Sequence, residues 1–173
     1  MTKVRGVTLV ELLVTLTVLT IIVAFAVPAA QDWLREARLD TGARALVATF
    51  QEARSEAVGR QQGVTLATVE GGLDWGGDVE LYTDADTSGN TAFDAGEDTL
   101  ILTMPAVGEG LRVTGDISAE DYISFRANGM LNEGGNTVSI SLCDTERRSP
   151  GHNIEINRAG RVRLTEGDCD SAT

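Results

Sequence analysis

The sequence predicts an α+β protein in which a long N-terminal helix packs on an antiparallel β-sheet or sandwich. Apolar residues recur with helical spacing up to about residue 60, and from Gly63 onward they alternate with the period of two that marks strands. The composition agrees, because 19 glycines and only 5% aromatic residues are typical of a turn-rich β domain. A chain of 173 residues has room for one domain beside a membrane segment.

Residues 7–30 read VTLVELLVTLTVLTIIVAFAVPAA and are almost wholly apolar. The run exceeds the roughly 20 helical residues that cross a bilayer core. Lys3 and Arg5 precede it and are expected to stay on the cytoplasmic side, which places the rest of the chain outside the inner membrane. Glu11 is the only ionisable side chain in the run, and a carboxylate near the centre of a bilayer costs about 2.5–3.5 kcal/mol. The cost is smaller near one end of the span, where a cation can offset it.

A secretory signal peptide is the alternative interpretation of this segment, with AFAVPAA as its cleavage site. The apolar core is too long for such a peptide, and it contains a carboxylate. The helical pattern also continues past the supposed cut. These features favour a retained membrane helix.

The helical pattern continues to about Arg60, and its apolar or small residues are expected to form one packing face. That face contains Trp33, Leu34, Ala37, Ala43, Leu46, Val47, Phe50, Ala53, Ala57 and Val58. Gly42 is expected to soften the helix, and Gly59 with Gly63 to end it. Pro28 lacks a backbone donor and is predicted to bend or locally loosen the helix near the membrane surface.

Eight short strands are predicted after the helix, separated mostly by turns rich in Gly or Asn. Their ranges are Val64–Val69, Asp78–Thr83, Thr99–Met104, Leu111–Gly115, Tyr122–Ala127, Thr137–Cys143, Asn153–Arg158 and Arg161–Glu166. The expected organisation is therefore a membrane half of the helix at 7–30, a periplasmic half at 31–60 and a β-rich domain at 61–173.

The string RGVTLVELLVTLTVLTIIVAFAVP resembles the class III signal of type IV pilins and type II secretion pseudopilins. The resemblance implies that residues 1–6 are a leader, that prepilin peptidase cleaves between Gly6 and Val7, and that the new terminus is N-methylated at Val7. Val7 stands where the family usually has Phe.

The resemblance further implies that Glu11 of one copy meets the terminal amine of the next during assembly. The alternative is a Glu11 that stays protonated or snorkels to the interface. Pro28 matches a helix-loosening proline of many pilins, although a simple helix irregularity fits equally.

Later blocks are similar to the GspH/FimT group of minor pilins and pseudopilins. They are LVATFQEARSEAVGRQQGVTL, LYTDAD, YISFRANG, ISLCD and INRAGRVRL. The similarity implies the pilin fold, a single-pass inner-membrane protein with a periplasmic C-terminal domain, and assembly with other subunits into a pilus or pseudopilus filament. The preferred interpretation is a minor subunit of a type IV pilus. The alternative is a GspH-type minor pseudopilin of a type II secretion system.

Some FimT-type proteins bind DNA through a GRxR motif near the C-terminus, and residues 160–163 read GRVR. Alternate residues of a strand share a face, so Arg161 and Arg163 are expected to reach successive phosphates together. Three further arginines would add to this basic corner: Arg147, Arg148 and Arg158. Because the net charge is −12, attraction to DNA would have to be local. The alternative is that these arginines protect an edge strand or pair with carboxylates.

An acidic stretch, DADTSGNTAFDAGED, is a weak calcium candidate. The ligands would be Asp84, Asp86, Ser88 and Asp94. Because Ala95 stands where a calcium loop needs a bidentate Glu, a solvated acidic loop is the preferred interpretation.

Cys143 and Cys169 are the only cysteines, and the predicted topology places them outside the reducing cytoplasm. A disulfide is therefore expected in preference to two free thiols. His152, the only histidine, is expected in a surface loop. The sequence contains no nucleophile motif and no phosphate-binding glycine loop, which predicts a structural subunit with no catalytic residues, no small-molecule substrate and no cofactor.

Overall fold

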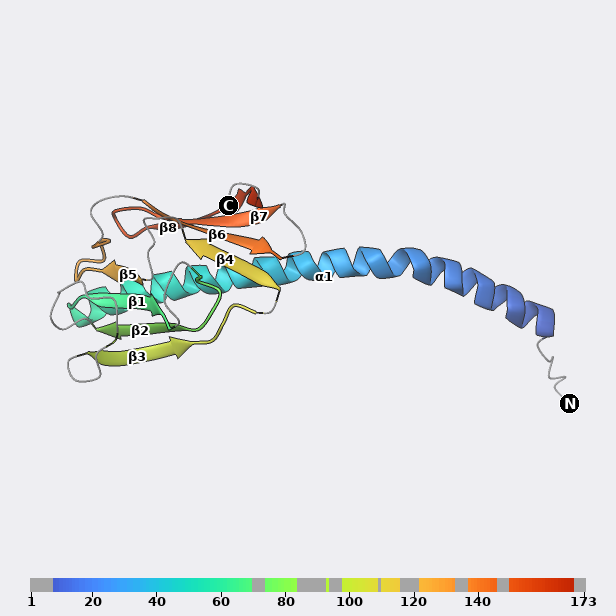
Figure 1. Ribbon diagram of the computed structural model, residues 1–173, viewed down its shortest axis with the longest axis horizontal. Coiled ribbons are helices and arrows are strands. Elements are labelled where there is room, and N and C mark those ends of the chain that lie inside the picture. Colours follow the sequence, from blue (N-terminus) through green and yellow to red (C-terminus); the bar gives the residue numbers. More distant parts are fainter. Residues whose placement is uncertain are drawn as a thin grey trace, which may run out of the picture. The chain divides into compact units, whose positions relative to one another are not determined.

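The computed structural model of this chain describes residues 8–69, 74–83, 93, 98–108, 110–115, 122–132, 137–145 and 150–169. These residues form one helix followed by eight strands, which confirms the predicted α+β class (Figure 1). The chain divides into two compact units, Met1–Ala37 and Arg38–Thr173.

Helix α1 runs from Leu9 to Arg60. Thr8 caps its start, because the Thr8 hydroxyl accepts a hydrogen bond from the Glu11 N–H at 3.3 Å. Within the first unit, the large apolar side chains between Leu9 and Val27 are exposed. This part of the helix is long and apolar enough to cross a membrane. Pro28 lies inside the helix, and a local bend there stays a prediction.

The eight strands form two four-stranded antiparallel sheets in the second unit (Figure 1). One sheet has the order β3-β2-β1-β5, and the other has the order β4-β6-β7-β8. The bounds are β1 Val64–Thr68, β2 Val79–Thr83, β3 Thr99–Met104, β4 Leu111–Gly115, β5 Tyr122–Phe125, β6 Val138–Asp144, β7 Gly151–Ile156 and β8 Val162–Gly167. Every predicted strand is present in this set.

The largest difference from prediction concerns β7, which begins and ends two residues earlier than Asn153–Arg158. Residues 157–160 form a turn instead, closed by a hydrogen bond from the Gly160 N–H to the Asn157 carbonyl oxygen at 2.7 Å. At the other end, Gly151 pairs with Gly167, so the strand extends toward its N-terminus.

One face of α1 forms the centre of the hydrophobic core of the second unit. Its buried side chains are Leu39, Ala43, Leu46, Phe50, Ala53 and Ala57. They pack together with buried residues of both sheets and with Trp75, whose ring centroid lies 5.8 Å from that of Phe50. The predicted face was too wide, because Trp33, Leu34 and Val58 are exposed.

Gly42 has a packing role in the helix, and the softening expected there stays a prediction. It is buried, and a Cβ at this position would lie 2.7 Å from Val107 Cγ1 and 2.9 Å from Leu111 Cδ1. Real Cβ atoms essentially never show such contacts. The glycine therefore lets the chain around Val107 and Leu111 approach the helix closely.

The helix ends through Gln61 and not through Gly59, which lies inside the last turn. Gln61 has a left-handed backbone with φ of 56°, and the Gln62 N–H donates to the Ala57 carbonyl oxygen at 3.3 Å. This is the hydrogen bond of a Schellman cap, a motif that usually places Gly where Gln61 stands. Gly59 was a misleading signal for the end of the helix, because the cap position is occupied by Gln61 and not by the glycine that such caps usually carry.

Candidate functional site

Arg161 lies immediately before β8 and Arg163 is its second residue; β8 is an edge strand of its sheet, and both arginine side chains are exposed. The intervening Val162 and the following Leu164 are partly buried and pack against the core. Partly buried and exposed positions therefore alternate along residues 161–164. That both guanidinium groups reach successive phosphates stays a prediction. Glu155 stands opposite Arg163 on β7, but no ion pair joins them in the described part of the chain.

Asn157 organises the turn that precedes these arginines. Its side-chain oxygen accepts a hydrogen bond from the Arg161 N–H at 3.0 Å, and its own N–H donates to the Arg161 carbonyl oxygen at 3.1 Å. Arg158 is exposed within the same turn. The turn therefore fixes where β8 begins and holds Arg161 directly before the strand.

Gly160, the first residue of the GRxR motif, lies in close contact with two other segments. It has φ of 71°, and a Cβ there would overlap the Gly129 carbonyl oxygen and lie 3.0 Å from Arg54 Nε. Arg54 Nε donates to that same carbonyl oxygen at 3.1 Å. The Leu131 N–H donates to the Arg158 carbonyl oxygen at 3.1 Å. Helix α1 and the turn after β5 therefore hold the arginine-bearing hairpin in place.

Two further arginines that belong to this neighbourhood were not predicted from the sequence. Arg54 reaches it from α1, and Arg126 begins the turn that contains Gly129. The exposed Arg126 side chain donates through Nε to the Asn132 side-chain oxygen at 2.9 Å. No local pattern reveals this grouping, because Arg54 lies 75 positions before Gly129 in the chain.

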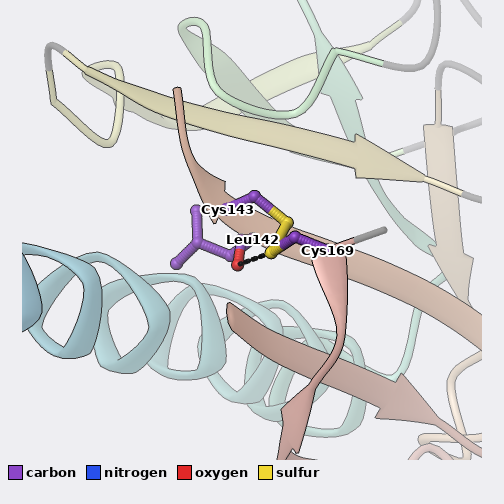
Figure 2. Close-up of a disulfide and its surroundings, with 3 residues drawn as sticks. All are labelled: Leu142, Cys143 and Cys169. Atoms are coloured by element: carbon purple, nitrogen blue, oxygen red, sulfur yellow. Dashed lines mark hydrogen bonds between the residues drawn. A yellow bond between two sulfur atoms is a disulfide. The ribbon is translucent and has the colours of Figure 1, made fainter. Parts of the chain in front are cut away.

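A disulfide joins Cys143 of β6 to Cys169 after β8, which confirms the predicted pairing (Figure 2). Cys169 Sγ lies 3.9 Å from the Leu142 carbonyl oxygen, the contact drawn as a dashed line in Figure 2. A disulfide sulfur carries no proton, so this is a packing contact. Gly151 packs against the bridge, since a Cβ at 151 would overlap Cys169 Sγ and lie 3.3 Å from Cys143 Sγ. The bridge therefore ties the end of β8 to the middle of its sheet.

His152 lies in β7 and not in a surface loop, so that prediction was wrong. Its Nε2 lies 2.7 Å from Asp40 Oδ1, and its side chain is 15% exposed. The pair links the helix to the sheet. Among the described residues, no group of three or more His, Cys, Asp or Glu side chains is arranged to hold a metal ion.

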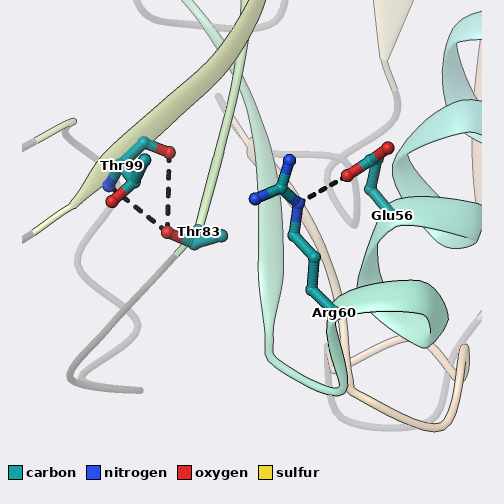
Figure 3. Close-up of polar contacts among 4 residues, drawn as sticks. All are labelled: Glu56, Arg60, Thr83 and Thr99. Carbon is teal, nitrogen blue, oxygen red and sulfur yellow. Dashed lines mark hydrogen bonds and ion pairs between the residues drawn. The ribbon is translucent and has the colours of Figure 1, made fainter.

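Several predicted site residues lie outside the described residues. They are Gly6, Val7, Asp84, Asp86, Ser88, Asp94, Arg147 and Arg148. The strands on either side of the acidic stretch are joined by Thr83 and Thr99, because the Thr99 N–H donates to Thr83 Oγ1 at 3.3 Å (Figure 3). Figure 3 also shows the ion pair between Glu56 and Arg60 in the last turns of α1.

Glu11 lies in the first turn of α1 and its side chain is exposed. Apolar side chains surround it along the helix, including the exposed Leu12 and Leu13. No ion pair involves Glu11 within the described residues. A carboxylate in this setting needs a cation from elsewhere if the segment enters a membrane or a packed helix bundle.

Comparison with protein families gives two matches. Residues 42–160 match the family described as type II transport protein GspH. Residues 1–27 match the prokaryotic N-terminal methylation motif, the segment that carries Gly6, Val7 and Glu11. None of the curated proteins matches the chain significantly.

Comparison with solved structures supports the same fold. The type IV minor pilin FimU of Pseudomonas aeruginosa is 23% identical, with a TM-score of 0.64 over 79% of this chain and 98% of that chain. A second crystal form of FimU gives 24% identity and a TM-score of 0.60 over 76% and 99%. The minor pseudopilin EpsH from the type 2 secretion system of Vibrio cholerae is 12% identical, with a TM-score of 0.50 over 75% and 97%.

Proposed function

This chain belongs to the GspH family of pilin-like minor pilins and pseudopilins, and from this premise we propose that it is a minor subunit of a type IV pilus. Membership of the family makes it a structural, non-enzymatic protein that assembles with other pilins and is processed by prepilin peptidase.

The observation that carries the proposal is the isolated carboxylate of Glu11 on an exposed apolar helix. The helix offers a lipid-compatible surface, and Glu11 interrupts it in the first turn. In a low-dielectric setting, two opposite charges attract strongly and relieve each other's desolvation cost. After cleavage between Gly6 and Val7, the methylated terminal amine of Val7 on a neighbouring subunit is the cation that Glu11 would meet.

Membrane insertion precedes this step in the proposal. Residues 7–30 span the inner membrane, the leader at 1–6 stays in the cytoplasm until it is cleaved, and residues 31–60 with the β-rich domain at 61–173 lie in the periplasm. The charges of Lys3 and Arg5 support this orientation. The disulfide supports it too, because disulfides persist outside the reducing cytoplasm.

Contact with DNA during uptake is the second part of the proposed role. Its support is the GRVR sequence where a turn leads into edge strand β8, with Arg161 and Arg163 both exposed and Arg158 exposed in the same turn. No aromatic side chain alternates with these arginines, so the contact would be made to phosphates and would not select a base sequence. Arg147 and Arg148, which lie outside the described residues, would extend the same basic segment.

A GspH-type minor pseudopilin of a type II secretion system is the second candidate. The family description over residues 42–160, type II transport protein GspH, favours it. The two candidates share the leader, the helix and the fold, and they differ only in which filament takes up the subunit. Complementation of a deletion strain separates them: restored surface pili support the first, and restored secretion of folded substrates supports the second.

Substitution of Glu11 tests the assembly step. Glu11→Gln removes the charge and keeps the shape of the side chain, so incorporation into sheared filaments should fall below detection while the membrane-bound pool persists. Glu36→Gln is the matched control, since Glu36 is also exposed on the same helix but lies beyond the apolar run. Equal incorporation of Glu11→Gln and the parent would overturn the proposal. Mass spectrometry of the mature N-terminus checks cleavage at Gly6 and methylation of Val7 in the same samples.

A further inference from the structure

Trp33 is a large aromatic side chain that the protein leaves uncovered. It is 67% exposed, whereas Trp75, the other tryptophan of the chain, is fully buried. Its neighbour Leu34 is also exposed. Leaving an indole in water forfeits the free energy that burial of so much apolar area provides, which points to an occupant outside the subunit.

The position of Trp33 along α1 indicates what that occupant is. At about 1.5 Å per residue, the helix rises about 36 Å between Leu9 and Trp33. The hydrocarbon core of a bilayer is about 30 Å thick, and the bilayer with its headgroups is about 40–45 Å thick. If Leu9 lies at the cytoplasmic boundary of the core, Trp33 therefore lies in the outer headgroup layer. Tryptophan is enriched in that layer because its ring is apolar and its N–H needs a polar partner.

The charge pattern changes at the same point. From Leu12 to Gln31 the helix carries no charged residue, and Asp32, Arg35 and Glu36 then follow within two turns. Trp33 thus stands where an apolar helix surface becomes a charged one. Such a boundary is typical of a helix that leaves a membrane.

We propose that Trp33 inserts into the headgroup layer at the outer face of the inner membrane and fixes how deeply the unassembled subunit lies. This inference rests on the proposed membrane insertion and adds the residue that sets its depth. A lipid surface is favoured over a neighbouring subunit because Trp33 lies within two helical turns of Val27, where the run of exposed large apolar side chains ends. The subunit is also held by lipid before it meets any neighbour.

Depth-dependent fluorescence quenching tests the inference on the full-length protein in phosphatidylcholine–phosphatidylglycerol vesicles. The variant Trp33→Phe reports Trp75 alone, so subtracting its emission from that of the parent isolates Trp33. Trp75→Phe provides a second measurement in which Trp33 is the only tryptophan, should that core substitution fold. Lipids brominated near the glycerol end of the acyl chain should quench Trp33 more than lipids brominated near the methyl end. The Trp33 emission should also shift to shorter wavelength when vesicles are added.

Flotation of the same samples separates the possible failures. If the protein floats with the vesicles but Trp33 is unquenched and emits as in water, the headgroup assignment is wrong while membrane insertion stands. If deep bromines quench Trp33 more strongly than shallow ones, the residue lies in the hydrocarbon core and the assignment is again wrong. If the protein does not float, the insertion on which the inference rests is itself overturned. If the Trp33 emission shifts to shorter wavelength only after a second subunit is added, and neither brominated lipid quenches it, the occupant is a neighbouring subunit and the headgroup assignment is wrong.

Discussion

Gly160 and Gly129 touch across two turns that lie far apart in the sequence, so closely that a Cβ on Gly160 would overlap the Gly129 carbonyl oxygen. Arg54 of α1 donates to the same oxygen at 3.1 Å. The glycine that opens the GRxR motif is therefore required by packing, independently of anything the arginines bind. Both glycines have positive φ, 71° and 76°, so a side chain at either position would also strain the backbone.

Replacing Gly160 with Ala should lower the free energy of unfolding by about 3 kcal/mol. A non-glycine residue in the left-handed region costs about 1–2 kcal/mol, and separating the two turns to relieve the overlap costs a further amount of similar size. Urea unfolding of the full-length protein in detergent micelles, followed by circular dichroism, measures the loss.

Gly77→Ala is the matched control for this substitution. A Cβ at 77 would meet nothing within 4 Å, so its effect should stay within about 0.5 kcal/mol. Parent-like stability of Gly160→Ala would show that the two turns are not in contact in solution.

Gln61→Gly should raise the free energy of unfolding by about 1 kcal/mol. Gln61 pays a steric cost for its φ of 56°, and Gly adopts this conformation at the end of a helix without that cost. Gln61→Ala retains a Cβ and should give no comparable gain. The same unfolding assay compares the two variants, and equal stability of both would argue against the left-handed cap.

The sequence was sufficient to predict the helix, all eight strands and the disulfide. The change from helical to alternating periodicity at Gly63 is a local signal, and β1 begins one residue later. The residues that end elements were harder to predict. Gly59 carries the usual helix-ending signal but lies inside α1, whereas Gln61 forms the cap because the chain must turn there to enter β1.

The sequence was insufficient for contacts between distant segments. Asp40 and His152 are 112 positions apart, yet their side chains meet at 2.7 Å because α1 packs beside β7. Arg54 joins the neighbourhood of the GRxR motif for a similar reason. Such pairs depend on how the helix lies on the sheets, and no pattern within one element encodes that arrangement.

Removing the disulfide with Cys143→Ala and Cys169→Ala should lower the free energy of unfolding by about 3.5 kcal/mol. The bridge closes a segment with a sequence separation of 26, and the chain-entropy model gives about this value for such a loop. Reduction of the parent protein with dithiothreitol should bring its unfolding midpoint toward that of the double variant. A midpoint that reduction leaves unchanged would contradict the predicted stabilisation.

Arg161→Gln and Arg163→Gln should each weaken binding to duplex DNA and make it less sensitive to salt. Each phosphate contact contributes about 0.9 to the slope of log affinity against log salt concentration, so each single variant should lower the slope by about that amount. Fluorescence anisotropy with a labelled duplex at several salt concentrations measures both quantities. Because both side chains are exposed, their unfolding midpoints should match the parent, which separates lost contacts from lost structure.

Arg112→Gln is the matched control, because Arg112 is exposed on β4 at the opposite edge of the same sheet. It removes the same charge and should leave the salt slope unchanged. Glu155 stands opposite Arg163 and repels phosphate, so Glu155→Gln should raise the affinity for DNA. If Arg112→Gln weakened binding as much as the two β8 variants, net charge and not the GRxR strand would govern the interaction, and the proposed DNA contact would fail.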